Sequence, residues 1–107
     1  MSLDVYLEDE NGNELYSRNI THNLNKMADA AGIYKVLWRP EEICITHACQ
    51  IIEPLTEGLT KLVINKQEFE QYNPKNGWGD YEGLVMFCAD YLQACKDNPD
   101  ALISVCR

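Results

Sequence analysis

Hydrophobic and polar residues alternate near both ends of the chain. Residues 3–8 (Leu-Asp-Val-Tyr-Leu-Glu) are apolar at every second position, which is typical of a strand with one buried face. Asn11-Gly12, followed by apolar residues at 15, 16 and 20, predicts a turn to an antiparallel partner strand. Residues 101–106 are rich in Leu, Ile and Val and predict a strand that pairs with residues 3–8 and brings the termini together.

The middle of the chain changes to a helical period. Apolar residues at 24, 27, 28 and 31 predict a short amphipathic helix, which Thr21 can cap and Gly32 can end. Apolar positions between residues 48 and 62 keep a helical phase across Pro54. We therefore expect one helix from Thr46 to about residue 64, kinked at the proline; a break there is the alternative.

The clearest helix precedes the last strand. Apolar residues from Tyr81 to Cys95 recur at i, i+3, i+4 and i+7, with Asp80 as a cap and Asp97-Asn98-Pro99 as a stop.

The connections between these elements have weaker patterns. Residues 33–40 are apolar and irregular, and Trp38 is expected to anchor them in the core. Pro40-Glu41-Glu42 is typical of a first helical turn, residues 67–72 can add another, and residues 73–77 read as a loop. The order ββαααβ predicts one α+β domain over residues 1–107, a small antiparallel sheet packed by three or four helices.

Charge and cysteine content narrow the function classes. Nine Lys and Arg against seventeen Asp and Glu give a net charge of -8, which disfavours nucleic acid and anionic membranes as partners. The N-terminal residues lack the pattern of a signal peptide, and no apolar run is long enough to span a bilayer. Five cysteines without the spacing of a disulfide framework favour free thiols and a cytoplasmic location.

One polar cluster lies at the start of the first predicted helix. Asn19, Thr21, His22 and Asn23 bring amides, a hydroxyl and an imidazole to a position where free backbone N–H groups favour an anion. The helix dipole also favours a neutral imidazole that can donate and accept near pH 7. The alternative is simple capping, with His22 solvated.

A second cluster precedes the last helix. Trp78 lies between two glycines in Asn76-Gly77-Trp78-Gly79, where it can stack on a ligand that the backbone approaches closely. The alternative is a structural plug folded over the core. Arg39 offers a forked cation for a carboxylate or phosphate, although such an arginine more often pairs with a nearby glutamate.

Metal binding and catalysis receive less support. Cys44, His47 and Cys49 could supply three zinc ligands, but their spacing is not that of a known finger. Cys88 and Cys95 lie on the apolar stripe and are expected to pack in the core. The familiar catalytic and phosphate-binding motifs are missing, and no cofactor is expected.

Six short strings stand out along the chain: Ser2-Leu3-Asp4-Val5-Tyr6-Leu7, Asn19-Ile20-Thr21-His22-Asn23-Leu24, Leu37-Trp38-Arg39-Pro40-Glu41-Glu42, Asn73-Pro74, Asn76-Gly77-Trp78-Gly79 and Tyr81-Glu82-Gly83-Leu84. As a set, these strings resemble those of a group of small proteins encoded by tailed bacteriophages, prophages and some bacteria. The resemblance covers nearly the whole chain, and Cys44, His47 and Cys49 are not part of its pattern. The family brings no activity with it, but small phage proteins often counter host defences by sequestering a signalling nucleotide or blocking a host protein.

Three functional hypotheses follow. The first is a non-enzymatic protein that binds a small anionic or nucleotide-like ligand. The second is a module that self-associates or docks on a host protein, with Met86 and Phe87 exposed. The third is a small enzyme that uses His22 as acid or base. The ligand-binding residues of the first hypothesis are Asn19, Thr21, His22, Asn23, Arg39, Trp78 and Tyr81.

Overall fold

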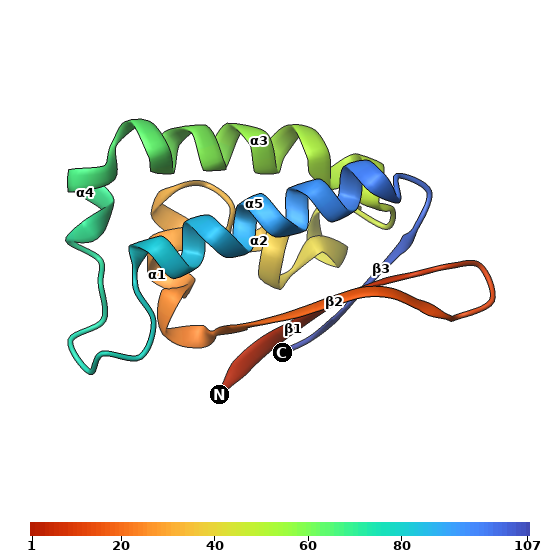
Figure 1. Ribbon diagram of the computed structural model, residues 1–107, viewed down its shortest axis with the longest axis horizontal. Coiled ribbons are helices and arrows are strands. Elements are labelled where there is room, and N and C mark those ends of the chain that lie inside the picture. Colours follow the sequence, from red (N-terminus) through yellow and green to blue (C-terminus); the bar gives the residue numbers. More distant parts are fainter.

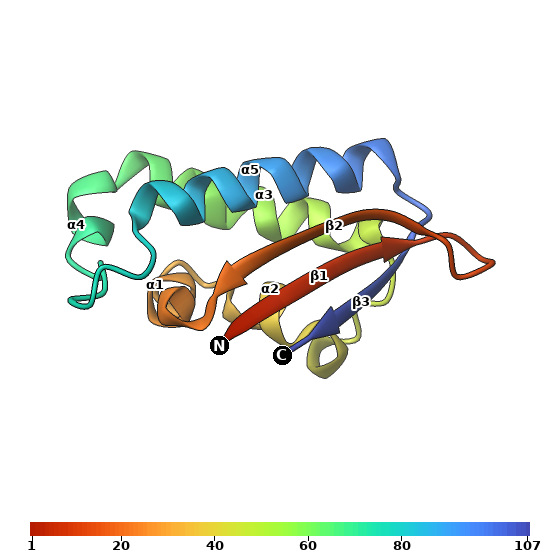
Figure 2. The ribbon, with the colours of Figure 1, turned by 60° about the horizontal axis from the view of Figure 1, so that its bottom comes forward.

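The computed structural model describes residues 1–107 and contains one three-stranded antiparallel sheet with strand order β2-β1-β3 (Figures 1 and 2). The strands are β1 (Ser2–Glu8), β2 (Glu14–Thr21) and β3 (Leu102–Cys106). Both the predicted hairpin and the predicted pairing of the C-terminal strand with β1 are confirmed. The two termini lie side by side in both views.

Helices cover one face of the sheet. The α-helices are α1 (Asn25–Ala30), α2 (Tyr34–Trp38), α3 (Ala48–Ile64), α4 (Lys66–Glu70) and α5 (Tyr81–Asp97), and two 3-10 turns are η1 (His22–Leu24) and η2 (Pro40–Ile43). Leu3, Val5 and Leu7 of β1 are fully buried toward these helices, while the residues between them face the more open side. The predicted α+β class with a small antiparallel sheet is therefore confirmed.

The long helices α3 and α5 run beside each other above the sheet (Figure 1). α3 is continuous through Pro54, so the alternative of a break at the proline is wrong. Asp80 caps α5 as predicted, because its Oδ1 accepts from the Gly83 N–H at 2.7 Å. Cys88 and Cys95 are fully buried, as expected of packing residues.

The segment between the hairpin and α3 differs in part from the prediction. The first helix is divided into η1 and α1, and the expected irregular stretch 33–40 contains the short helix α2. A single turn gives little periodicity to read, and burial of Val36, Leu37 and Trp38 holds this one in place. Trp38 is only 2% exposed, so its predicted role as a core anchor is confirmed. No helix has both the length and the hydrophobicity to cross a bilayer.

Candidate functional site

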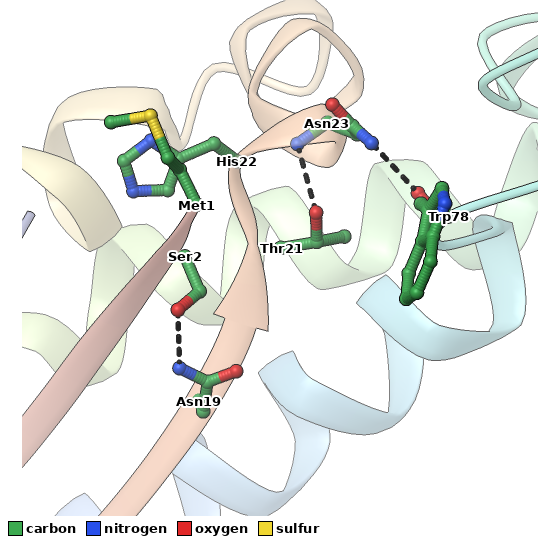
Figure 3. Close-up of a pocket in the computed structure, with 7 residues that line it drawn as sticks. All are labelled: Met1, Ser2, Asn19, Thr21, His22, Asn23 and Trp78. Atoms are coloured by element: carbon green, nitrogen blue, oxygen red, sulfur yellow. Dashed lines mark hydrogen bonds between the residues drawn. The ribbon is translucent and has the colours of Figure 1, made fainter. Parts of the chain in front are cut away.

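A cavity of about 640 Å³ lies where the start of β1, the end of β2 and the loop before α5 meet (Figure 3). This volume is typical of small-molecule sites. The cavity brings together five of the seven residues predicted to bind a ligand and adds Met1 and Ser2, the first residue of β1. Its lining residues are Met1, Ser2, Asn19, Thr21, His22, Asn23 and Trp78.

The hairpin register explains why Ser2 joins the predicted residues. Ser2 pairs with Thr21 across β1 and β2, and Asn19 Nδ2 donates to Ser2 Oγ at 2.9 Å. The sequence did predict the two strands and their turn. Reading the pairing on to the far end of the hairpin would have placed Ser2 opposite Thr21, so a usable signal was present.

Asn23 joins the two polar strings to each other. Its Nδ2 donates to the Trp78 carbonyl at 3.4 Å and lies 3.5 Å from Asn76 Oδ1. Asn76 Oδ1 also accepts from the Trp78 N–H at 3.0 Å, which closes a tight turn within the loop. The end of β2 and the loop before α5 are therefore one connected structure, although 55 positions separate Asn23 from Trp78.

Gly79 lets this loop lie directly on the end of β2. It has φ of 93°, and a Cβ atom there would lie 2.7 Å from Thr21 Cγ2 and 3.0 Å from Leu24 Cγ. Gly77 has φ of 78° but no heavy atom within 4 Å of an added Cβ. Both positions require a backbone conformation that favours glycine, whereas only Gly79 is also fixed by a close approach.

Trp78 is exposed in spite of this tight anchoring. The residue is 71% exposed and lines the cavity, so the interpretation of a plug folded over the core is wrong. That role belongs to Trp38. Exposing the large apolar surface of an indole to water is unfavourable. The loop nevertheless keeps Trp78 in this position, because glycines and asparagine side chains hold its backbone. This arrangement is suited to stacking on a planar ligand.

His22 turns its ring toward the core tryptophan. The His22 and Trp38 rings meet edge to face, with centroids 6.3 Å apart and an angle of 77° between their planes. His22 Nε2 is buried and has no hydrogen-bond partner. Figure 3 shows the imidazole beside Met1, away from Trp78. Because Nε2 cannot meet a molecule in the cavity, the ring can reach one only through its other edge.

The start of the first helical segment is capped rather than open. Thr21 Oγ1 accepts from the Asn23 N–H at 3.3 Å, and the His22 N–H donates to the Met1 carbonyl at 3.2 Å. These backbone donors are the ones that the predicted anion cradle would have used. Capping, the alternative given by the sequence, describes this turn. The expectation that His22 is solvated is wrong, because its ring packs against Trp38 and its Nε2 is buried.

The start of α5 is also capped by a side chain, and Tyr81 is the first residue of this helix. Asn73 Oδ1 accepts from the Tyr81 N–H at 2.7 Å. The Tyr81 side chain is only 5% exposed, and its hydroxyl donates to the Leu62 carbonyl at 2.6 Å. Tyr81 thus packs α5 against α3 and does not line the cavity, because its helical position on the apolar stripe turns it inward.

Arg39 also lies outside the cavity. Its Nη1 lies 2.9 Å from Glu42 Oε2, and its Nε donates to the Tyr34 hydroxyl at 3.2 Å. The hydrogen bonds to Tyr34 and Glu42 raise the pKa of Arg39 above its usual range. The local ion pair that the sequence gave as the alternative is therefore the one observed.

No charged side chain lines the cavity beneath Trp78. The nearest carboxylate contact is indirect: Asn19 Nδ2 donates to Asp4 Oδ1 at 2.7 Å. A negative charge at this margin disfavours an anion next to Asn19. The Asn19 side of the cavity is thus better suited to an uncharged, planar and polar group than to a phosphate.

The possible zinc ligands do not converge. No group of three or more His, Cys, Asp or Glu side chains is arranged to hold a metal ion. Cys44 and Cys49 are exposed, and His47 Nδ1 lies 2.8 Å from the Thr46 hydroxyl. His47 serves as the residue before α3, and its N–H donates to Gln50 Oε1 at 3.0 Å.

The two apolar residues singled out for an interaction surface differ in position. Met86 is 62% exposed, whereas Phe87 is 1% exposed. The expectation that Phe87 faces solvent is therefore wrong, because it falls on the buried side of α5 beside Tyr91. A single exposed methionine is ordinary for a protein surface.

Comparison of the chain with protein-family models, curated proteins and solved structures gives no match.

Proposed function

We propose that this chain is a non-enzymatic binding protein for a small nucleotide-like molecule, whose planar ring stacks on Trp78 over the cavity at the end of the β1–β2 hairpin. The observation that carries the proposal is the 71% exposure of an indole held by an ordered, capped and interlocked loop. Stacking on an aromatic ring stabilises a bound base by about 1–3 kcal/mol. A rigid platform loses less entropy on binding than a mobile one.

Polar groups around the cavity support recognition of a heterocycle. The Thr21 hydroxyl accepts from Asn23 N–H and keeps its own proton for a ligand. Asn19 uses its Nδ2 for Ser2 and Asp4, which leaves its carbonyl oxygen to accept from a ring N–H. A few polar groups beside an aromatic surface are the usual composition of a ligand site.

The two other hypotheses are less well supported. An enzyme that relies on His22 would have to work with Nε2 buried against the core. Of the two residues that the interaction module was expected to expose, Met86 is exposed, whereas Phe87 is buried in the core.

The biological setting of the proposal comes from the resemblance to small phage and prophage proteins. A cytoplasmic accessory protein that holds a signalling nucleotide without converting it would lower the free concentration of that nucleotide. An anti-defence role of this kind needs binding alone and is consistent with a site that lacks a placed catalytic group.

Intrinsic fluorescence tests the proposal, because the chain has two tryptophans in opposite environments. Nucleosides, nucleotides and cyclic nucleotides are titrated into the wild type and into Trp78→Ala, Trp78→Phe and Asn19→Ala. We expect saturable quenching of the exposed Trp78, with the buried Trp38 unaffected. Binding followed by thermal shift should be lost in Trp78→Ala and partly kept in Trp78→Phe, since a ring remains.

Met86→Ala is the matched control, because it removes another exposed apolar side chain and should leave binding unchanged. A ligand at 100 times its Kd should add about 2.7 kcal/mol to the free energy of unfolding. If no compound quenches Trp78, or if Trp78→Ala binds as well as the wild type, the proposal is wrong.

A further inference from the structure

A second cavity of about 670 Å³ adjoins the one beneath Trp78, because His22 and Asn23 line both. It lies between α1 and the loop that follows α4, and it is dominated by amide side chains and two lysines. Its lining residues are His22, Asn23, Asn25, Lys26, Gln71, Tyr72, Asn73, Pro74, Lys75 and Asn76.

The charge of this second cavity is opposite to that of the chain. The whole sequence has a net charge of -8, yet Lys26 and Lys75 line the cavity and no carboxylate does. Neither lysine forms an ion pair with the chain's own acids: the ion pairs involve Arg18, Lys35, Arg39 and Arg107. Two unpaired ammonium groups facing one cavity on an acidic protein favour an anion there.

We propose that the two cavities form one bipartite site for a nucleoside phosphate, with the base on Trp78 and the phosphate between Lys26 and Lys75. This inference rests on the proposed function and specifies its ligand class. The Trp78 cavity has no Lys, Arg, Asp or Glu side chain in its lining and has Asp4 at its margin, whereas Lys26 and Lys75 line the neighbouring cavity without a carboxylate. Lysine binds phosphate as a point charge, and amide side chains add hydrogen-bond donors.

Asn23 is the positioning residue that joins the two halves. Its side chain contacts the Trp78 carbonyl from one cavity and Asn76 of the other. Lys75 and Trp78 belong to the same loop, so the hydrogen bonds of Asn23 hold the loop backbone that carries both residues against η1, which directly precedes α1 and Lys26.

Calorimetric titration of paired compounds tests the inference. The ribonucleosides, their 5′-monophosphates and inorganic phosphate are each titrated into the wild type, Lys26→Gln/Lys75→Gln, and the control Lys66→Gln/Lys96→Gln. The control removes the same charge from lysines that line neither cavity. Charge-assisted hydrogen bonds should make a monophosphate bind about tenfold or more tightly than its nucleoside.

We expect the Lys26→Gln/Lys75→Gln variant to bind the monophosphate as weakly as the nucleoside and to keep the wild-type affinity for the nucleoside. The control variant should keep the preference. Added NaCl should weaken monophosphate binding and leave nucleoside binding almost unchanged.

Each other outcome has its own meaning. Nucleoside binding with no preference for the phosphate, or a preference that survives the loss of both lysines, overturns the phosphate site and leaves the Trp78 proposal standing. Lysine-dependent binding of inorganic phosphate without binding of any nucleoside or monophosphate shows a phosphate site alone and overturns the bipartite ligand. Absence of all binding overturns the proposed function and this inference together.

Discussion

Replacing Gly79 with alanine tests whether the loop before α5 is fixed by contact with the end of β2. The added Cβ would lie 2.7 Å from Thr21 Cγ2 and 3.0 Å from Leu24 Cγ, so one of the two segments must move. Gly77→Ala is the matched control, because it adds the same methyl group at a similar positive φ but meets no atom within 4 Å.

The magnitude follows from three contributions. A left-handed backbone conformation costs an alanine about 1–2 kcal/mol, and the loss of chain entropy in the unfolded state returns about 0.4–1 kcal/mol. These two contributions are shared by both variants, so Gly77→Ala should lower the free energy of unfolding by about 1 kcal/mol. Crowding against Thr21 and Leu24 should lower the free energy of unfolding of Gly79→Ala by about 1–3 kcal/mol more.

Urea unfolding followed by far-UV circular dichroism measures this difference. We expect the midpoint of Gly79→Ala to fall clearly below that of Gly77→Ala, and its Tm to lie about 4 °C or more lower. Displacement of Trp78 should also weaken any ligand that stacks on it. Equal stability of the two variants, within about 0.5 kcal/mol, would refute the argument that Gly79 is selected for close packing.

Two further predictions concern side chains outside the site. Arg18, 2.8 Å from Asp90, and the Tyr16 hydroxyl lower the pKa of the Asp90 carboxyl. This contribution is present above the unfolded pKa and is lost as pH falls through the folded pKa, so Asp90→Asn should cost about 0.5–1 kcal/mol at pH 7 and almost nothing near pH 2. A cost in urea unfolding that is equal at both pH values would contradict this. Burial raises the pKa of Cys88 and of Cys95 to about 12, so only the three exposed thiols should react with a thiol reagent in the folded protein, and all five in urea. Five fast-reacting thiols without denaturant would show that α5 is not packed as described.

The fold could be predicted from the sequence wherever apolar residues recur regularly over a long segment. Both strands of the hairpin, the helix across Pro54 and the stripe of α5 are each at least seven residues long, and each was found. The short helix α2 was missed because five residues, Tyr34 to Trp38, are too few to show a helical repeat. Its conformation is set by burial of Trp38 and its neighbours, which is tertiary information.

The candidate site could be predicted only in part, for a related reason. The polar strings 19–23 and 76–79 were recognisable from their composition, but the sequence did not show that Asn23 and the Trp78 loop bind each other. Arg39 has the chemistry of an anion ligand in the sequence, but in the fold its Nη1 lies 2.9 Å from Glu42 Oε2 and forms a local ion pair. Lys26 and Lys75 are isolated in the sequence and show no pattern there, because only the fold brings them to the lining of one cavity.

The asparagine-rich string 19–23 and the string 76–79, in which two glycines flank Trp78, are better explained together than separately. If they served only to cap two helices, the loop would need Asn73 and Asp80, which accept from the first N–H groups of α5, but it would not need an indole in solvent. A structural role alone also does not explain why two lysines and no carboxylate line one cavity on a chain of net charge -8. A ligand with a flat ring and a negative group accounts for both observations at once, because it covers the apolar surface of Trp78 and neutralises the lysines.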